Sequence, residues 1–161
     1  MATTPRIDAI ETSVQDLKPT SQVRSYSGAG FGTPTATKIR RYSTNTVTGT
    51  AITCSGNDAT NGTTYTINEN GVYAMSIQDT RSGAAGGTVG ISLNSSSLGT
   101  NISALGNTQI LGFATNAIAG QFFSLSVTFR LVAGDVVRPH CDGNLDGVDS
   151  ARFTITQVAK T

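Results

Sequence analysis

The stretch 122–137 constrains the fold of this chain more than any other. From residue 122 to 131 it reads Phe-Phe-Ser-Leu-Ser-Val-Thr-Phe-Arg-Leu, so that apolar and polar side chains alternate. A period of two is the pattern of a β-strand with one face in a core and the other in water. The turn-forming residues Ala-Gly-Asp follow at 133–135, and two valines come next. The stretch therefore predicts a β-hairpin at the corner of a packed sheet.

Similar strand-like segments recur at short intervals, separated by turns rich in Gly, Asn and Asp. The expected strands are 47–53, 65–67, 72–78, 89–93, 109–113, 122–131, 136–137 and 153–158. This spacing predicts an all-β, antiparallel sandwich or barrel and not a parallel α/β sheet. A chain of 161 residues, 37% hydrophobic and only 13% charged, is long enough for one such domain to bury its own core.

One short amphipathic helix is predicted at the N-terminus, over residues 4–18. Thr4 is a suitable cap, Pro5 fits the first helical position, and Pro19 ends the helix. The apolar stripe of this helix consists of Ile7, Ile10, Val14 and Leu17. A helix of this length is marginal alone, so we expect the stripe to be buried on its own β-domain, on sister subunits or on another protein.

A polar segment separates this helix from the first expected strand. Residues 20–37 are rich in Ser, Thr, Gly and Pro and predict an extended arm. Lys38, Arg40 and Arg41 follow in a strand-like stretch, where they indicate either a solvated edge strand guarded by charge or a contact with an acidic partner. The predicted organisation is thus an anchor helix (1–19), an extended arm (20–41) and a β-sandwich domain (42–161).

The overall charge and the cysteine content exclude several classes of function. A formal charge of +1 draws the chain neither to nucleic acid nor to an anionic membrane. We find no secretory signal and no apolar run long enough to span a bilayer, and therefore expect synthesis in a cytoplasm. Cys54 and Cys141 predict two reduced thiols, with a single disulfide left open as the alternative.

One loop contains oxygen ligands at the spacing of a calcium site. Asp142, Asn144, Asp146 and Asp149 alternate with other residues as in the first half of a calcium-binding loop. The twelfth position, where a bidentate acid is needed, holds Phe153, and a strand follows. The loop is therefore a weak metal candidate, and a polar hairpin loop is the favoured interpretation.

The chain offers little for catalysis. His140 is its only histidine, and the adjacent Cys141 points to the opposite face of a strand, so the two are badly placed as a base and a nucleophile. No paired carboxylates stand out. We therefore expect no enzyme, no catalytic residue and no cofactor.

Four short motifs resemble the globular heads of the complement-head and tumour necrosis factor superfamily. They are Tyr-Thr-Ile-Asn-Glu-Asn-Gly-Val-Tyr at 65–73, Gly-Ile-Ser-Leu-Asn at 90–94, Leu-Val-Ala-Gly-Asp-Val-Val at 131–137 and Phe-Thr-Ile at 153–155. The resemblance implies a ten-strand jelly roll that assembles as a homotrimer. The side chains that it places in the core or along the trimer axis are Tyr73, Phe123, Leu125, Val127, Phe129 and Phe153.

A small, Thr/Ser/Gly-rich chain with a helical N-terminal peg also resembles virion proteins of tailed bacteriophages. That resemblance implies a trimeric capsid decoration (cement) protein, which binds the major capsid protein or another virion protein through the helix stripe and Lys38, Arg40 and Arg41. The alternative is the tip of a tail or head fibre that attaches to a host surface glycan or protein. In both cases the expected location is the virion.

Overall fold

The computed structural model describes residues 21–27, 32–33, 36–80, 87–116, 121–142 and 151–161. The predicted N-terminal helix, with Ile7, Ile10, Val14 and Leu17, lies outside these residues. The elements are β1 (Ser21–Tyr26), β2 (Thr44–Thr48), β3 (Ile52–Cys54), β4 (Tyr65–Ile67), β5 (Gly71–Thr80), β6 (Gly87–Leu93), β7 (Ile110–Asn116), β8 (Phe122–Leu131), β9 (Val136–Cys141), β10 (Arg152–Lys160) and two short 3-10 helices, η1 (Ile102–Ala104) and η2 (Asn107–Gln109). No helix in the described part of the chain is long and apolar enough to cross a bilayer.

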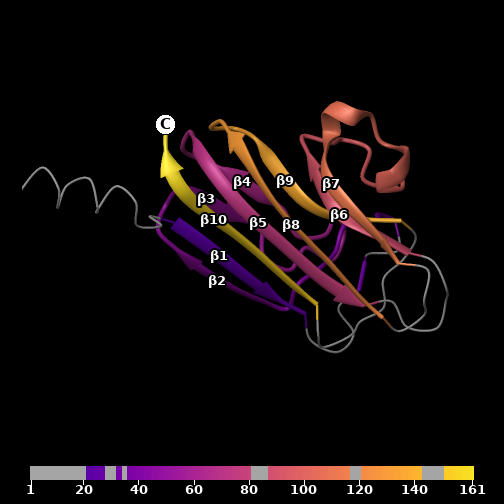
Figure 1. Cartoon of the computed structure of the whole chain (residues 1–161). Helices are drawn as coiled ribbons and strands as arrows, with labels where there is room; N and C mark the ends of the chain where they lie inside the picture. The colour runs from indigo at the N-terminus through magenta and orange to yellow at the C-terminus, as the bar shows by residue number, and fades with distance from the viewer. Residues whose placement is uncertain (1–20, 28–31, 34–35, 81–86, 117–120, 143–150) are drawn as a thin grey trace, which may run out of the picture.

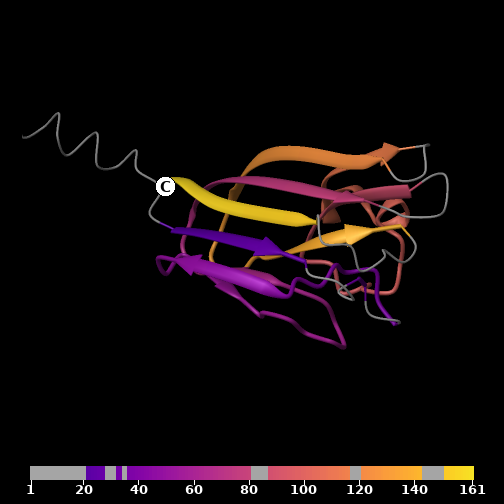
Figure 2. The ribbon, with the colours of Figure 1, turned by 90° about the horizontal axis from the view of Figure 1, so that it is seen from below.

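The strands form two five-stranded sheets that pack face to face (Figures 1 and 2). Sheet A has the order β2-β1-β10-β5-β8, and sheet B has the order β3-β4-β9-β6-β7. Every strand pairing in these two orders is antiparallel. The all-β antiparallel sandwich is confirmed, and the strand order is consistent with a jelly roll.

The core lies between the two sheets, where the alternating side chains of each strand meet. Phe153 of β10 is fully buried and packs on Tyr65 of β4, with ring centroids 4.6 Å apart. Tyr42 approaches the same ring at 6.4 Å. These aromatic contacts join the two layers, and large buried rings contribute much of the apolar area that a core removes from water.

Strand β1 lies within the segment that was expected to be an extended arm. It pairs with β10 on one side and with β2 on the other, so residues 21–26 belong to the sandwich. Val23 is the only apolar residue on the buried face of β1, because Ser21 and Ser25 occupy the neighbouring buried positions. The alternation of burial is therefore present in the structure but was hidden in the sequence.

The expected strand at 47–53 is two strands in different sheets. β2 belongs to sheet A and β3 to sheet B, and the chain crosses between the layers at 49–51. Gly49 has a φ of 75° at this crossing. That backbone conformation is readily adopted by glycine and rarely by other residues, so Gly49 provides the turn.

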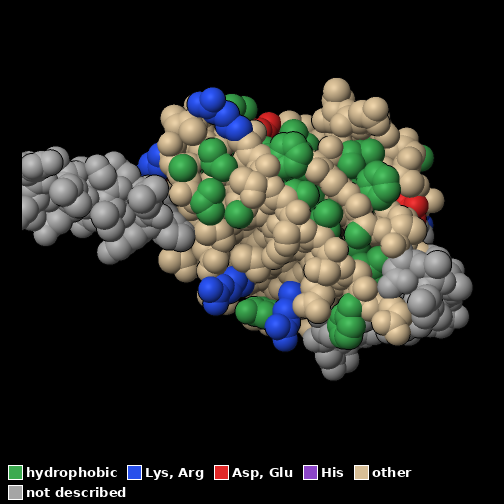
Figure 3. Space-filling model, viewed as in Figure 1, with side chains coloured by type: hydrophobic (Ala, Val, Ile, Leu, Met, Phe, Trp, Pro, Cys, Tyr) green, Lys and Arg blue, Asp and Glu red, His purple; other side chains and the backbone are tan. Residues whose placement is uncertain are grey.

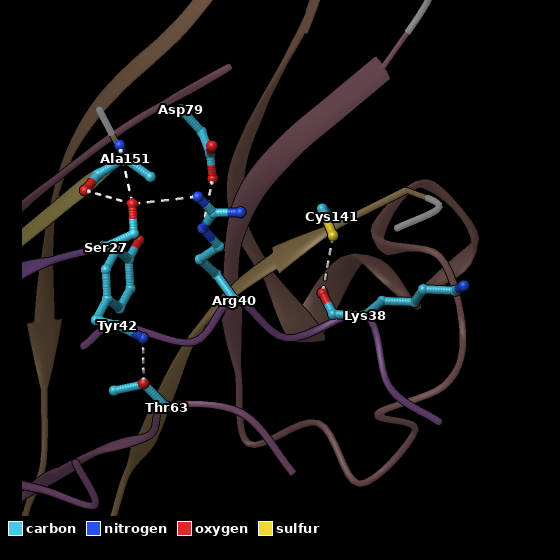
Figure 4. Close-up of polar contacts among 8 residues, drawn as sticks. All are labelled: Ser27, Lys38, Arg40, Tyr42, Thr63, Asp79, Cys141 and Ala151. Atoms are coloured by element: carbon cyan, nitrogen blue, oxygen red, sulfur yellow. Dashed lines mark hydrogen bonds and ion pairs between the residues drawn. The ribbon is translucent and has the colours of Figure 1, made fainter. Parts of the chain in front are cut away.

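A buried ion pair closes the end of the sandwich at which β1 ends and β10 begins (Figure 4). The Nε atom of Arg40 lies 3.2 Å from Oδ2 of Asp79, and both side chains are 0% exposed. The Arg40 guanidinium also donates to the Ser27 hydroxyl at 3.3 Å. The prediction of Arg40 on a solvated edge or a partner-binding surface is therefore wrong: its charge faces inward, where Asp79 compensates it.

A network of three polar side chains ties together the turns of the opposite end, where both β1 begins and β10 ends. The Asn94 amide donates to Asp135 at 2.8 Å, and its oxygen accepts from the Val136 N–H at 2.7 Å. The Asn70 side chain accepts from the Ala133 N–H at 2.9 Å. These side chains replace the backbone partners that are lost where strands end. Three of the motifs behind the superfamily resemblance thus meet in one network.

The outer face of sheet B is covered by the chain itself. The segment 94–109, which includes η1 and η2, lies against β6, β7 and β9. A Cβ atom on Gly90 would come within 2.5 Å of Ile102, so the glycine makes room for this buried side chain. The Arg138 guanidinium donates to the Ser95 carbonyl at 2.9 Å and holds the start of the segment.

We predict that the Arg40–Asp79 pair is strongly non-additive in stability. Asp79→Asn should lower the free energy of unfolding by about 3–5 kcal/mol, because it leaves the guanidinium buried without a counter-charge. The double variant Arg40→Leu with Asp79→Leu should lose far less unfolding free energy, since neither charge of the pair remains in the core. Urea denaturation of the three proteins measures both effects. A double variant at least as unstable as Asp79→Asn would contradict this account.

Candidate functional site

The outer face of sheet A, unlike that of sheet B, has no other described segment packed on it. Its side chains are aligned in rows by the cross-strand register. Three rows run across the whole sheet from β2 to β8. The first consists of Thr44, Tyr26, Arg152, Gln78 and Ser124, and the second of Thr46, Arg24, Thr154, Ser76 and Ser126. The third consists of Thr48, Gln22, Thr156, Ala74 and Thr128. Most of these residues are Ser or Thr. The face is thus rich in hydroxyl groups and contains few charged or large apolar side chains.

A hollow of about 350 Å³ lies in the centre of this face. The hollow exists because β5, β8 and β10 place small side chains next to one another. Its lining consists of Ala74, Met75, Ser76, Ser126, Val127, Thr128, Thr154 and Thr156. Figure 3 shows this face with a centre free of charged side chains and with basic side chains near its margins. A concave, uncharged surface of this kind is suited to receiving side chains of another protein surface.

Exposed aromatic side chains lie along the side of the sandwich formed by β7 and β8, the last strands of sheets B and A. Phe113 is 50% exposed and Phe129 is 38% exposed. Between these strands, a Cβ atom on Gly112 would come within 2.9 Å of Val127, so the two edges are closely packed. This side therefore presents apolar rings to the surroundings next to the hydroxyl-rich face.

The residues predicted for the core or trimer axis fall into two groups. Tyr73, Phe123 and Phe153 are buried in the core of the chain itself. Leu125 and Val127 are partly buried and pack against that core, and Phe129 is exposed. Sequence reasoning missed the Ser/Thr face because a search for apolar stripes passes over small polar residues. The period-two spacing of hydroxyl residues in 44–48, 124–128 and 154–156 was the available signal.

The three basic residues predicted to bind a partner do not form one surface. Arg40 is buried, whereas Lys38 and Arg41 are partly exposed. The Lys38 carbonyl accepts from both the backbone N–H and the thiol of Cys141, each at 3.0 Å (Figure 4). The Arg41 N–H donates to the Gly32 carbonyl at 3.2 Å. The segment is thus held by β9 and by the chain before it, and the Lys38 side chain points away from the buried Arg40 (Figure 4).

The structure gives the calcium interpretation no support within the described residues. Asp142 accepts from the Ser103 N–H at 3.0 Å and so helps to fasten η1. Asn144, Asp146 and Asp149 lie outside the described part of the chain. Among the residues that are described, no group of three His, Cys, Asp or Glu side chains is placed to hold a metal ion.

His140 has a structural role under the segment 94–109. One ring nitrogen lies 2.7 Å from the Thr100 carbonyl and the other 3.1 Å from the Ser92 hydroxyl. Because a carbonyl only accepts, Nε2 carries the proton of the neutral ring and Nδ1 accepts from Ser92. Burial lowers the pKa of His140, and the nearby Arg138 lowers it further, against the raising effect of the Thr100 bond and Asp142. His140 and Ser92 are both buried, so a substrate could not reach this pair.

Neither cysteine is placed for reactivity. Cys54 is partly buried and Cys141 is buried, and both are free thiols. Burial raises the pKa of each thiol, most strongly that of Cys141. The thiolate is the reactive form, so both groups behave as small structural side chains.

Comparison with known proteins identifies the fold. No family model and no curated protein matches the sequence. Solved structures do match: GITRL from pika (14% identity, 89% of this chain and 98% of that chain, TM-score 0.53), murine APRIL (12%, 85% and 98%, 0.60) and the Eiger TNF of S. frugiperda (12%, 89% and 96%, 0.59). The chain has a TNF-like fold. At these identities the likeness concerns the fold alone, and it confirms the jelly-roll architecture that the sequence motifs implied.

We predict that stability falls as the pH drops through about 6.5, the ordinary pKa of histidine. The pKa of His140 is lowered in the folded chain, so below that pH the unfolded chain binds a proton that the folded chain does not. The slope of the unfolding free energy is at most about 1.4 kcal/mol per pH unit for one group. Urea denaturation between pH 7.5 and 5.5 measures it. The unfolding free energy of the His140→Asn variant should change little over this pH range. An equal slope in the variant would show that His140 is not the group responsible.

Proposed function

We propose that this chain is a structural virion protein of a tailed bacteriophage, a homotrimer that decorates the capsid. The observation that carries the proposal is the uncovered, hydroxyl-rich and hollowed outer face of sheet A on a TNF-like fold. The virion setting comes from the resemblance of the sequence to decoration and fibre proteins. The structure contributes a surface whose composition suits assembly.

Two features favour association of this face with further copies of the chain. Interface cores are depleted in charged residues, and the centre of this face contains none. The exposed rings of Phe113 and Phe129 on the adjoining side provide apolar area that a neighbouring copy would remove from water. Closed rotational symmetry then gives a finite assembly in which each copy uses the same surfaces.

The position of β1 indicates which end of the sandwich would face the capsid in the proposed assembly. Ser21 pairs with Gln157, so β1 starts at the end of the sandwich where β10 finishes, and the C-terminus lies there as well (Figure 1). Residues 1–20 join the body at this end. An anchor formed by that segment would bind the shell there and turn the end closed by Arg40 and Asp79 outward.

The candidate groups for chemistry favour an assembling protein over an enzyme. His140 holds a covering segment, and burial raises the pKa of both thiols. These described side chains thus fasten the fold, and the open face of sheet A is rich in hydroxyl groups.

A charge placed in the hollow should prevent assembly. We expect Ala74→Arg to shift the chain from trimer to monomer, because a guanidinium would fill the hollow and bring like charges together. The matched control is Ala59→Arg, which places the same side chain on an exposed turn. Sedimentation velocity with circular dichroism separates loss of assembly from loss of folding. A folded, trimeric Ala74→Arg protein would show that this face is not the surface through which copies assemble.

Deletion of residues 2–19 should abolish binding to capsids while the trimer remains intact. The measurement is co-sedimentation of the purified protein with undecorated phage particles, followed by sedimentation velocity of the truncated chain alone. Undiminished particle binding by the truncated protein would contradict the anchoring role. If the full-length protein instead competes with phage for adsorption to host cells, the fibre-tip function replaces decoration.

A further inference from the structure

All three charged residues on the outer face of sheet A are arginines at the rim of the hollow. Arg24 lies directly opposite Thr154 of the lining, Arg152 lies two residues before Thr154 on β10, and Arg130 lies two residues after Thr128 on β8. All three are exposed. Arg24 and Arg152 are diagonal neighbours on adjacent strands, a position in which Cα atoms are roughly 7–8 Å apart. The Arg152 guanidinium lies over the Tyr26 ring, 5.8 Å from its centroid, and this contact restricts its direction.

None of the described acidic residues lies on the outer face of sheet A, and each has a partner elsewhere in the chain. Glu69 forms an ion pair with Lys160 at 2.9 Å. The Asp58 carboxylate accepts from the N–H groups of Thr60 and Asn61.

The remaining two acids on the surface are partly buried and also accept hydrogen bonds. Asp135 accepts from the Asn94 amide and from the Val132 N–H, and Asp142 accepts from the Ser103 N–H. A second copy of this face therefore adds arginines and, among the described residues, no carboxylate. Bringing several such faces together raises the repulsion between their positive charges, which a low local dielectric strengthens.

We propose that the outer face of sheet A binds a free oxyanion of the phosphate class, held by Arg24, Arg152 and the Thr154 hydroxyl, and that this anion neutralises the face when copies assemble. Guanidinium groups are fork-shaped donors that match the geometry of phosphate oxygens. The hydroxyls of the hollow add neutral donors that can rotate toward the anion. Arg130, at the far rim, adds to the positive potential of the hollow.

This inference rests on the proposed homotrimer and specifies the condition under which the trimer forms. If the assembled state binds phosphate more tightly than the single chain does, mass action lowers the protein concentration needed for half-assembly. With phosphate at ten times its dissociation constant from the assembled state, each bound ion raises the equilibrium constant for assembly by a factor of about ten at most.

The test compares the full-length chain in potassium phosphate and in potassium chloride, at equal pH and ionic strength, by sedimentation equilibrium. We expect assembly at lower protein concentration in phosphate. Arg24→Gln and Arg152→Gln should each lose this difference and should assemble in chloride at least as readily as the native chain, because less charge then needs neutralising. Lys38→Gln, which removes one positive charge outside this face, is the matched control and should keep the phosphate response.

Each outcome decides between the inference and the proposed function. Equal assembly in the two salts, or variants of Arg24 and Arg152 that still respond to phosphate, would overturn the anion site and leave the trimer standing. A chain that is monomeric in both salts overturns the trimer. In that case phosphorus NMR decides the site: line broadening of phosphate by the native chain, lost in the two variants, supports it, and its absence in the native chain overturns it.

Discussion

The buried ion pair of Arg40 and Asp79 is the contact on which the described architecture depends. It holds residues 36–42 across one end of the sandwich, where the Arg40 N–H donates to the Pro139 carbonyl and the Arg40 carbonyl accepts from the Thr63 N–H. The same segment bridges to β9 beside His140, which fastens the covering segment 94–109. Because either charge alone would be costly inside the core, this end of the fold is stable only as a unit.

The two sheets differ in what covers them, and this difference indicates where function lies. Ile102 and its neighbours cover the outer face of sheet B, whereas the outer face of sheet A carries rows of Ser and Thr around a hollow. Burying small hydroxyl side chains within one chain would add little to its stability. A face made of such side chains nevertheless permits the close approach of another backbone. His140 and Cys141 are engaged in holding the fold, which supports our proposal that this chain acts by assembly.

The sequence predicted the sandwich well wherever apolar alternation was strong, as in β5, β8 and β10. It failed for β1, whose buried face is built from Ser21, Val23 and Ser25 and therefore lacks an apolar pattern. It failed for Arg40 because the compensating Asp79 lies far along the chain, and only the folded structure brings them together. The candidate surface was missed because the search for an interface followed apolar residues such as Tyr73, which was expected in the core or along the trimer axis and lies in the core.

The central claim is that the uncovered face of sheet A brings copies of this chain together. Size-exclusion chromatography with multi-angle light scattering, on the purified full-length protein in phosphate buffer, tests this claim most directly. The account predicts a principal species of three times 16.6 kDa, the mass of one chain. A principal species of 16.6 kDa at micromolar concentration, from protein shown to be folded by circular dichroism, would contradict it.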